Sequence, residues 1–239
     1  MDLNNYFTFD STTSTSLSTY ISGEGSFNAP ERVYDMKVIP GRNGALAIDE
    51  RRFENIDVTY PAFIFKQDGT SFESAMADLR SSLMSRNGYK RLTDTYHPDE
   101  FRMAIFKTAI EVDPKNINRA GEFDLVFTCK PQRFLTSGET VTTKTSSGTI
   151  TNPTQFDARP LLVVTGTGNL TVNGVQIAIS KTPTTIDCEA MEAYNGTTSR
   201  NGDIVLTPNQ FPVLKPGSNT ITLGSGITKV QITPRWWRI

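Results

Sequence analysis

The sequence predicts a mainly β chain of two domains, the first of which also contains one helix. Short segments that alternate apolar and polar residues recur along the chain and are separated by Gly, Pro and Asn, a pattern typical of strands joined by turns. A single segment, residues 71–86, has helical spacing instead. The composition also changes near Leu135, from charge-rich before it to rich in Thr, Ser and Asn after it.

Size and charge exclude several classes of protein. The chain has 239 residues, 37% of them hydrophobic, with a net charge of -1, so it is neither disordered nor basic like most nucleic-acid binders. No apolar run approaches the roughly 20 residues that span a bilayer. The first residues lack the basic and apolar regions of a signal peptide. We therefore expect a soluble protein made in a cytoplasm, with no nucleic-acid partner and no membrane insertion.

A long hairpin is predicted in the first domain. Residues 33–39 alternate apolar and polar side chains, residues 45–48 form the return strand, and residues 56–60 alternate again as a half-buried strand. Between them, Asn43-Gly44 favours a type I′ turn, which needs positive φ at both central positions.

The predicted helix covers residues 71–86. Thr70 and Glu73 form a capping box, and Asn87-Gly88 supplies a left-handed stop. Its apolar side chains recur along one stripe: Phe72, Met76, Leu79 and Leu83.

The remaining segments complete the domain plan. Strands are expected at 101–112 and 122–129 and close a first domain at residues 1–135. Residues 136–152 are dominated by Ser and Thr and are interpreted as a linker or a long hairpin between the domains. Residues 153–239 contain short strands with regular turn signals, which indicate a β-sandwich.

No catalytic, metal or cofactor site is predicted. His97 is the only histidine; with Asp94 and Asp99 it suggests a metal site, but a solvated polar turn explains it better, because no anchored ligand set accompanies it. Asp187 and Glu189 do not by themselves indicate a glycosidase. The chain is therefore not expected to be an enzyme.

The two cysteines, Cys129 and Cys188, lack close Cys or His partners. Cys129 shares strand parity with apolar residues, and so does Cys188. We expect both to be buried, reduced thiols.

The two tryptophans, Trp236 and Trp237, are adjacent. If the last strand continues through Pro234, its alternation places Trp236 in a core and Trp237 at a domain or subunit contact. A bulge at Pro234 would exchange these roles. A pair that stacks on sugar is the alternative interpretation.

Several stretches together resemble a family, the distal tail proteins (Dit) of long, non-contractile-tailed bacteriophages, mostly of Gram-positive hosts. The resemblance covers nearly the whole chain and lies in the order and spacing of the stretches. In the first half they are Pro40-Gly41-Arg42-Asn43-Gly44, Tyr60-Pro61, Leu79-Arg80, Gly88-Tyr89-Lys90-Arg91-Leu92, Phe101-Arg102-Met103-Ala104, Gly121-Glu122-Phe123-Asp124-Leu125 and Cys129-Lys130-Pro131-Gln132-Arg133-Phe134. In the second half they are Asn152-Pro153-Thr154, Phe156-Asp157-Ala158-Arg159-Pro160-Leu161, Val172-Asn173-Gly174, Ile186-Asp187-Cys188-Glu189, Phe211-Pro212, Pro216-Gly217 and Thr233-Pro234-Arg235-Trp236-Trp237.

The resemblance implies a structural virion protein at the distal end of a phage tail, assembled in the bacterial host cytoplasm. Such proteins form a homo-hexameric ring that joins the tail tube protein to the tail-associated hub protein and anchors receptor-binding proteins. It implies an N-terminal β-sandwich with a helix and an extended hairpin arm, here about residues 33–60, followed by a galectin-like β-sandwich. The arm tip, Gly41, Arg42, Asn43 and Gly44, is then expected at a subunit interface.

A function of another class stays open. The second domain would be a carbohydrate-binding, lectin-like module that recognises host cell-wall glycan through Trp or Tyr. Glycan binding by the isolated domain would favour a lectin, whereas a defined oligomer without such binding would favour an adaptor.

Overall fold

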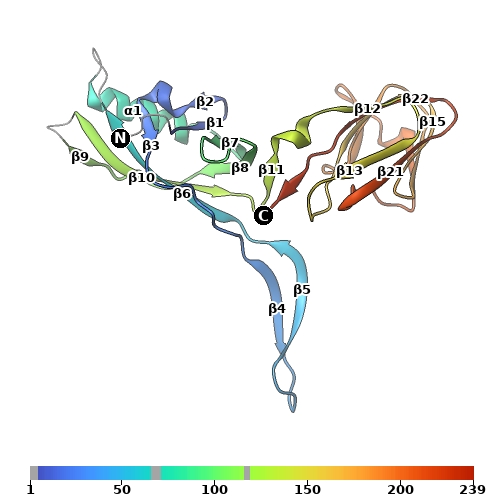
Figure 1. Cartoon of the computed structure of the whole chain (residues 1–239), viewed down its shortest axis with the longest axis horizontal. Helices are drawn as coiled ribbons and strands as arrows, with labels where there is room; N and C mark the ends of the chain where they lie inside the picture. The colour runs from blue at the N-terminus through green and yellow to red at the C-terminus, as the bar shows by residue number, and fades with distance from the viewer. Residues whose placement is uncertain (1–4, 66–70, 116–118) are drawn as a thin grey trace. The chain divides into compact units, whose positions relative to one another are not determined.

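The computed structural model describes residues 5–65, 71–115 and 119–239. The chain divides into two compact units, residues 1–133 with Ile239 and residues 134–238. Figure 1 traces both units, with the hairpin of β4 and β5 projecting from the first. The prediction of a mainly β chain is confirmed, and α1 is the one α-helix in the described residues.

The strands of the first unit join into one sheet in the order β2-β1-β7-β8-β10-β6-β3, and β9 also pairs with β10. Their bounds are β1 Phe7–Phe9, β2 Thr12–Thr13, β3 Thr19–Ile21, β6 Ile56–Phe65, β7 Lys90–Asp94, β8 Glu100–Phe106, β9 Asp113–Lys115 and β10 Ala120–Cys129, with a 3-10 turn at Ser14–Leu17. Strand β11, Arg133–Leu135, crosses the boundary between the units.

Aromatic side chains form the centre of the first core. Phe7 on β1 contacts Phe127 on β10 with ring centroids 5.3 Å apart, although β7 and β8 lie between these strands in the sheet. Phe7 also stacks with Tyr60 of β6 at 6.0 Å. The sheet must therefore curl until its two halves face each other and enclose a core in the manner of a sandwich.

Helix α1, Phe72–Met84, packs its apolar stripe on this core. Met76, Leu79 and Leu83 are buried, as the helical spacing predicts. The N-cap is Ser71, whose Oγ accepts a hydrogen bond from the Ser74 amide at 3.0 Å, an interaction that satisfies an otherwise free helix donor. The predicted capping residue Thr70 lies outside the described residues.

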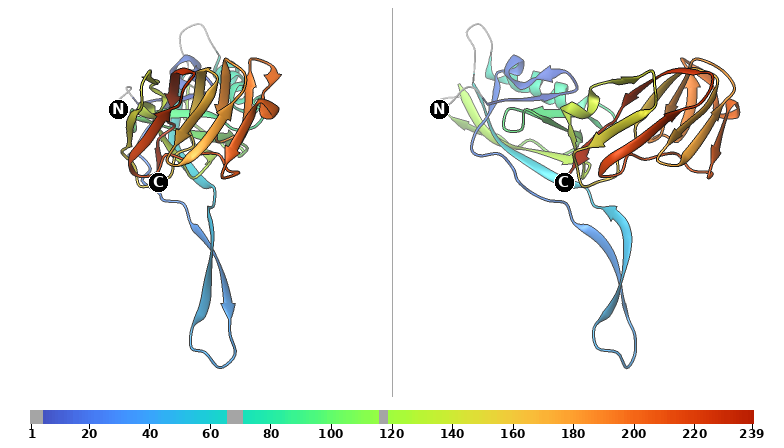
Figure 2. Two further views of the ribbon diagram at one scale, coloured as in Figure 1. Left: turned by 90° about the vertical axis from the view of Figure 1, so that its right-hand side faces the viewer. Right: turned by 45° about the vertical axis from the view of Figure 1, so that its right-hand side comes forward.

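Strands β4, Arg32–Val38, and β5, Ala45–Phe53, form a separate two-stranded sheet. We call residues 32–53 the arm; it extends away from the first unit in each view of Figure 2. The predicted hairpin is present, but β6 belongs to the main sheet, so the arm ends at Phe53 and does not extend to residue 60.

The second unit is a two-layer sandwich. One sheet has the order β12-β22-β14-β17-β18-β19, and the other has the order β13-β21-β15-β16-β20. The bounds are β12 Thr142–Lys144, β13 Gly148–Asn152, β14 Leu161–Gly166, β15 Gly168–Val172, β16 Val175–Ile179, β17 Thr184–Asp187, β18 Glu192–Asn195, β19 Thr198–Ser199, β20 Ile204–Thr207, β21 Gly217–Leu223, β22 Ile227–Thr233 and β23 Trp237–Arg238, with 3-10 turns at Thr136–Glu139 and Asn201–Asp203.

The interpretation of residues 136–152 as a linker or a long hairpin is wrong, because their two strands pair with other strands and not with each other. These residues form a 3-10 turn followed by β12 and β13. Strand β12 pairs with β22 and β13 pairs with β21, so each becomes an edge strand of one sheet of the sandwich. Thr is a β-branched residue that favours strands, and the stretch contains many of them.

Both cysteines are free and buried, as predicted. Burial raises the pKa of Cys129 and of Cys188 to about 12, so the reactive thiolate is scarce at neutral pH. We expect native protein to show almost no reaction with a thiol reagent at pH 8, and two thiols to react after denaturation. Rapid labelling of native protein, or a loss of stability on adding reductant, would contradict this prediction.

Candidate functional site

The arm concentrates exposed apolar surface. Six of the twelve large apolar side chains that the described residues leave exposed lie on it: Tyr34, Met36, Val38, Ile39, Leu46 and Ile48. Val38 retains 82% of its accessible surface. Apolar surface gathered on one element of a folded chain marks an interaction site.

The strand register divides these side chains between two faces. Tyr34, Met36 and Val38 lie opposite Asp49, Ala47 and Ala45, and directly opposed residues share a face. Beyond the Tyr34–Asp49 pair, this face of the arm is therefore apolar, with Met36 and Val38 opposite two alanines. The other face combines Leu46 and Ile48 with Lys37 and Asp35, which form an ion pair at 3.1 Å.

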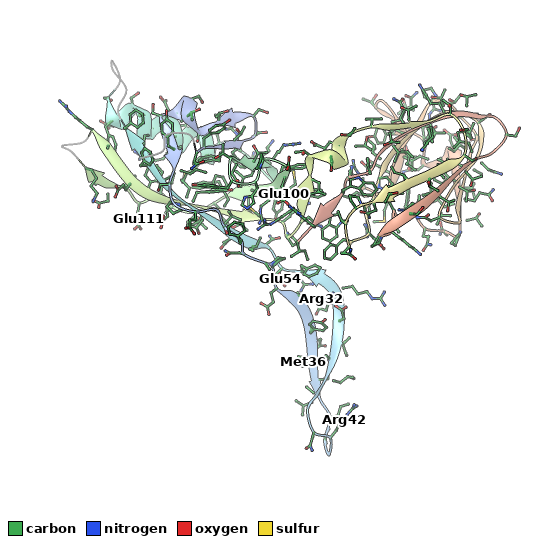
Figure 3. All side chains as sticks on the ribbon, viewed as in Figure 1. Arg32, Met36, Arg42, Glu54, Glu100 and Glu111 are labelled. Atoms are coloured by element: carbon green, nitrogen blue, oxygen red, sulfur yellow. The ribbon has the colours of Figure 1, made fainter. Side chains whose placement is uncertain are left out.

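The base of the arm is held by charge pairs. Arg32 binds the Asp49 carboxylate through Nε and Nη2 and also lies 5.6 Å from the centre of the Phe53 ring. This pair lowers the pKa of Asp49. Next to it the register shifts, and Arg51 adopts φ of 58°. The apolar outer half thus follows a polar base; Figure 3 labels Arg32 there and Met36 further out.

Gly41, Arg42, Asn43 and Gly44 lie at the tip of the arm, but the turn there differs from the predicted one. The Arg42 amide donates to the Ile39 carbonyl at 3.2 Å, with Pro40 and Gly41 between them and φ of +78° at Gly41. Pro followed by Gly at these positions defines a type II turn. Gly44 also has positive φ but Asn43 does not, so the predicted type I′ turn is wrong. Pro40-Gly41 prevails because proline fixes the first central φ.

His97 does not lie in a solvated turn. Its Nδ1 is 3.0 Å from Asp94 Oδ1, and its side chain is only 18% exposed. Tyr60 donates to the other carboxylate oxygen at 2.6 Å, and the Phe27 ring contacts the imidazole. The prediction of a solvated turn was wrong because Tyr60 and Phe27, which cover this site, come from distant parts of the sequence.

A buried charge pair, which no sequence pattern predicts, lies beside these residues. Glu100 on β8 and Arg133 approach at 3.5 Å, and both are largely buried. Arg133 Nη2 also donates to the carbonyls of Ser26 and Asn28, in the segment that leads into the arm. The pair, in which Figure 3 labels Glu100, therefore helps to fix the root of the arm.

The structure places Trp236 in the core of the second unit with 5% exposure, as predicted, while Trp237 is partly exposed. Trp237 stacks on Phe156 at 4.4 Å and donates to the Asp157 carbonyl at 2.9 Å. A sugar-stacking pair is thus excluded, since Trp236 is buried and Phe156 covers one face of Trp237.

The strand-parity reason for the burial of Trp236 is wrong. Strand β22 ends at Thr233, and Arg235 has φ of 58°, so the alternation does not continue to Trp236. The segment is held by hydrogen bonds from the Arg235 amide to the Gly138 carbonyl and from the Leu135 amide to the Trp236 carbonyl.

The Asp187 carboxylate is held in an ion pair with Arg235, which weighs against a role as a glycosidase acid. Its two oxygens accept hydrogen bonds from Arg235 at 2.7 and 2.9 Å. This pairing lowers the pKa of Asp187 below its ordinary value of 3.8.

A carboxylate whose pKa is lowered by folding stabilises the fold above its unfolded pKa, and the contribution is lost as pH falls through the folded value. We expect Asp187→Asn to reduce the free energy of unfolding at pH 7. The difference in this free energy between the variant and the unmodified chain should become smaller below about pH 4. Urea unfolding of both chains at a series of pH values between about 7 and 3 measures this difference. Asp157→Asn, the same substitution at an exposed acid of the same unit, is the control; a difference between the variant and the unmodified chain that does not depend on pH would contradict the prediction.

Among the described residues, no group of three or more His, Cys, Asp or Glu side chains is arranged to hold a metal ion. No helix in the described ranges combines the length and apolar character needed to cross a membrane.

Comparison with known proteins places the fold. No family model matches the chain, and no curated protein matches it. Among solved structures, the chain is similar to the Dit protein of phage SPP1, described as a paradigm of the hub adsorption apparatus in phages infecting Gram-positive hosts. The TM-score is 0.75 and the identity 13%, over 98% of this chain and 99% of that one.

Two structures of the phage p2 baseplate in its activated conformation also match. With Ca the TM-score is 0.51, at 10% identity over 95% of this chain and 97% of that one. With Sr it is 0.53, at 10% identity over 98% of both chains. At these identities the similarity establishes the fold, and it confirms the fold class predicted from the sequence.

Proposed function

We propose that this chain is the distal tail protein of a long-tailed phage. Six copies form a ring at the distal end of the virion tail, after synthesis in the bacterial host cytoplasm. The ring joins the tail tube protein to the tail-associated hub protein and anchors receptor-binding proteins.

The exposed arm carries this proposal. An isolated two-stranded hairpin is at best marginally stable in water, and this one presents an apolar face that none of the described residues of its own chain covers. A second protein surface is the natural cover. When the arm of one copy binds a different surface of the next copy, the contact is heterologous and closes into a ring if the rotation fits.

Light scattering coupled to size exclusion and negative-stain imaging test the proposal. We expect six-fold rings, single or stacked back to back, at micromolar concentration. A monomer at all concentrations, with no rings on grids, would refute it.

The lectin alternative rests on less. It needs Trp or Tyr side chains of the second unit to stack on sugar, but Trp236 is buried and Phe156 covers one face of Trp237. Host cell-wall carbohydrate remains a partner to be tested by exposing residues 134–238 and the assembled protein to a glycan panel. Specific binding without a defined oligomer would favour this function over the ring.

A further inference from the structure

A small polar cavity lies inside the first unit, close to the segment that leads into the arm. Its volume is about 10 Å³, and its lining includes Tyr60, Asp94, His97, Glu100 and Arg102. A cavity needs roughly 10–15 Å³ and two to four polar partners to hold one water molecule. This cavity therefore has room for one water molecule and for nothing larger.

The Asp94 carboxylate fixes the position of the proton on the His97 ring. It accepts hydrogen bonds from the Tyr60 hydroxyl at 2.6 Å and from the His97 amide at 2.8 Å, and its Oδ1 lies 3.0 Å from His97 Nδ1. A carboxylate only accepts hydrogen bonds, so Nδ1 carries the hydrogen, and Nε2 of the neutral ring is an acceptor. This Nε2 atom is buried and has no hydrogen-bond partner among the described residues.

Arg102 contributes a donor to the same cavity. The residue is 8% exposed, and its Nη1 is buried with no hydrogen-bond partner in the described part of the chain. Burial lowers the pKa of Arg102 and the nearby Arg133 lowers it further, whereas Glu100 acts in the opposite direction. Because a buried polar atom without a partner loses its hydration and gains nothing in return, such atoms are rare in folded proteins.

The charges around the cavity restrict what can bridge these two atoms. The Arg102 guanidinium disfavours a cation, and the carboxylates of Asp94 and Glu100 disfavour an anion. A neutral molecule that both accepts and donates hydrogen bonds satisfies Arg102 Nη1 and His97 Nε2 together, and water is the one that fits the volume. Glu100, which also lines the cavity, offers an acceptor for the second hydrogen of the water.

The His97 ring supports residues 22–31, which connect β3 to the arm. The Phe27 ring meets the imidazole edge to face, with ring centroids 5.6 Å apart. A Cβ at Gly25 would lie 3.3 Å from His97 Cε1 and 3.0 Å from Tyr96 Cβ, so the backbone crosses close to both side chains. The orientation of the imidazole therefore determines the surface on which this segment rests.

We propose that one buried water molecule occupies this cavity, accepts a hydrogen bond from Arg102 Nη1 and donates one to His97 Nε2. It completes a chain of hydrogen bonds that runs from Tyr60 through Asp94 and His97 to Arg102, and that connects β6, β7 and β8. Arg102 is then a positioning residue, which holds the imidazole under the root of the arm. All of these groups belong to one copy of the chain, so the site does not depend on the proposed ring.

A crystal structure that resolves ordered waters tests the site directly. We expect one water within about 2.7–3.2 Å of both Arg102 Nη1 and His97 Nε2. Solid-state NMR adds a measurement that does not depend on the size of the assembly. His97 is the only histidine, so protein labelled with 15N-histidine shows one pair of ring nitrogens. At about pH 8, above the ordinary titration range of histidine, we expect a protonated Nδ1 and an unprotonated Nε2 that accepts a hydrogen bond.

Arg102→Met removes the donor and keeps a side chain of similar reach. The Nε2 signal should then move toward that of a free acceptor. The amides of His97 and Glu100, which donate hydrogen bonds within this turn, should exchange with deuterium about fivefold faster, as expected for the loss of one hydrogen bond. Arg80→Met, at an exposed arginine of α1, is the matched control and should change neither measurement.

Three results in the unmodified chain would overturn the proposal: an empty cavity, an ion in place of the water, or a direct hydrogen bond between Arg102 and His97. An Nε2 signal that Arg102→Met leaves unchanged would overturn it as well. If Arg102→Met does not fold, the density and the ring nitrogens of the unmodified chain still decide.

Discussion

A chain in which Tyr34, Met36 and Val38 are all replaced by Ser is expected to fold normally and to lose the ability to form a ring. These side chains form the uncovered apolar face of the arm. Burying such a side chain contributes about 1.5–3 kcal/mol, so losing three weakens each subunit contact by more than about a thousandfold. Sedimentation or light scattering should show a monomer at concentrations where the unmodified chain forms rings.

The matched control is a triple Ser variant of Val141, Met191 and Val205, apolar residues of the second unit that are equally exposed. It removes similar surface outside the arm and should leave the ring intact. Both variants should change the free energy of unfolding of the monomer by no more than about 0.5 kcal/mol per site, as expected for surface substitutions. Rings that persist in the arm variant would rule out the arm as the assembly element.

The arm also shows what sequence alone determines. The alternation at Tyr34, Met36 and Val38 predicts a strand with one apolar face, and the strand is present. Alternation is normally interpreted as half-burial, yet here no layer of the described chain covers that face. The same alternation occurs in a strand whose apolar face is covered by its own chain and in a strand whose apolar face is covered by another chain. The covering layer is a property of tertiary or quaternary structure.

Local turn chemistry was predictable only where one signal acted alone. Gly88 has the left-handed φ of +71° expected after the helix. At the arm tip two turn signals compete within five residues, and Pro40-Gly41 prevails over Asn43-Gly44. The prediction for residues 136–152 was wrong for a related reason. Ser and Thr are compatible with both linkers and edge strands, and only the pairing with β21 and β22 distinguishes the two.

A shallow groove on the first unit had no signal in the sequence. Glu122 and Asp124 are visible as the polar positions of an alternating strand, which usually means a solvated face. They line the groove together with Pro61 on the paired strand and Glu111 on a separate segment. Three segments distant in sequence must meet before this groove exists, so only the fold reveals it.

Trp236→Ala is expected to destabilise the second unit by about 3–5 kcal/mol, the usual range for removing a large aromatic side chain from a core. Trp236 packs in the core of that unit, where the surrounding sandwich cannot collapse freely into the space. The neighbouring Trp237→Ala is the natural comparison. It removes a partly exposed ring, one stacking contact and one hydrogen bond, so its effect should be clearly smaller.

The measurement benefits from the composition of the chain, which has only these two tryptophans, both in the second unit. Fluorescence therefore follows the unfolding of that unit in urea, separately from the first unit, and avoids a two-state assumption for the whole chain. Single-tryptophan variants, Trp236→Phe and Trp237→Phe, show which ring is shielded: the chain that keeps Trp236 should emit at the shorter wavelength. If Trp237→Ala costs as much as Trp236→Ala, or if Trp237 proves the more shielded ring, the assignment of Trp236 to the core is wrong.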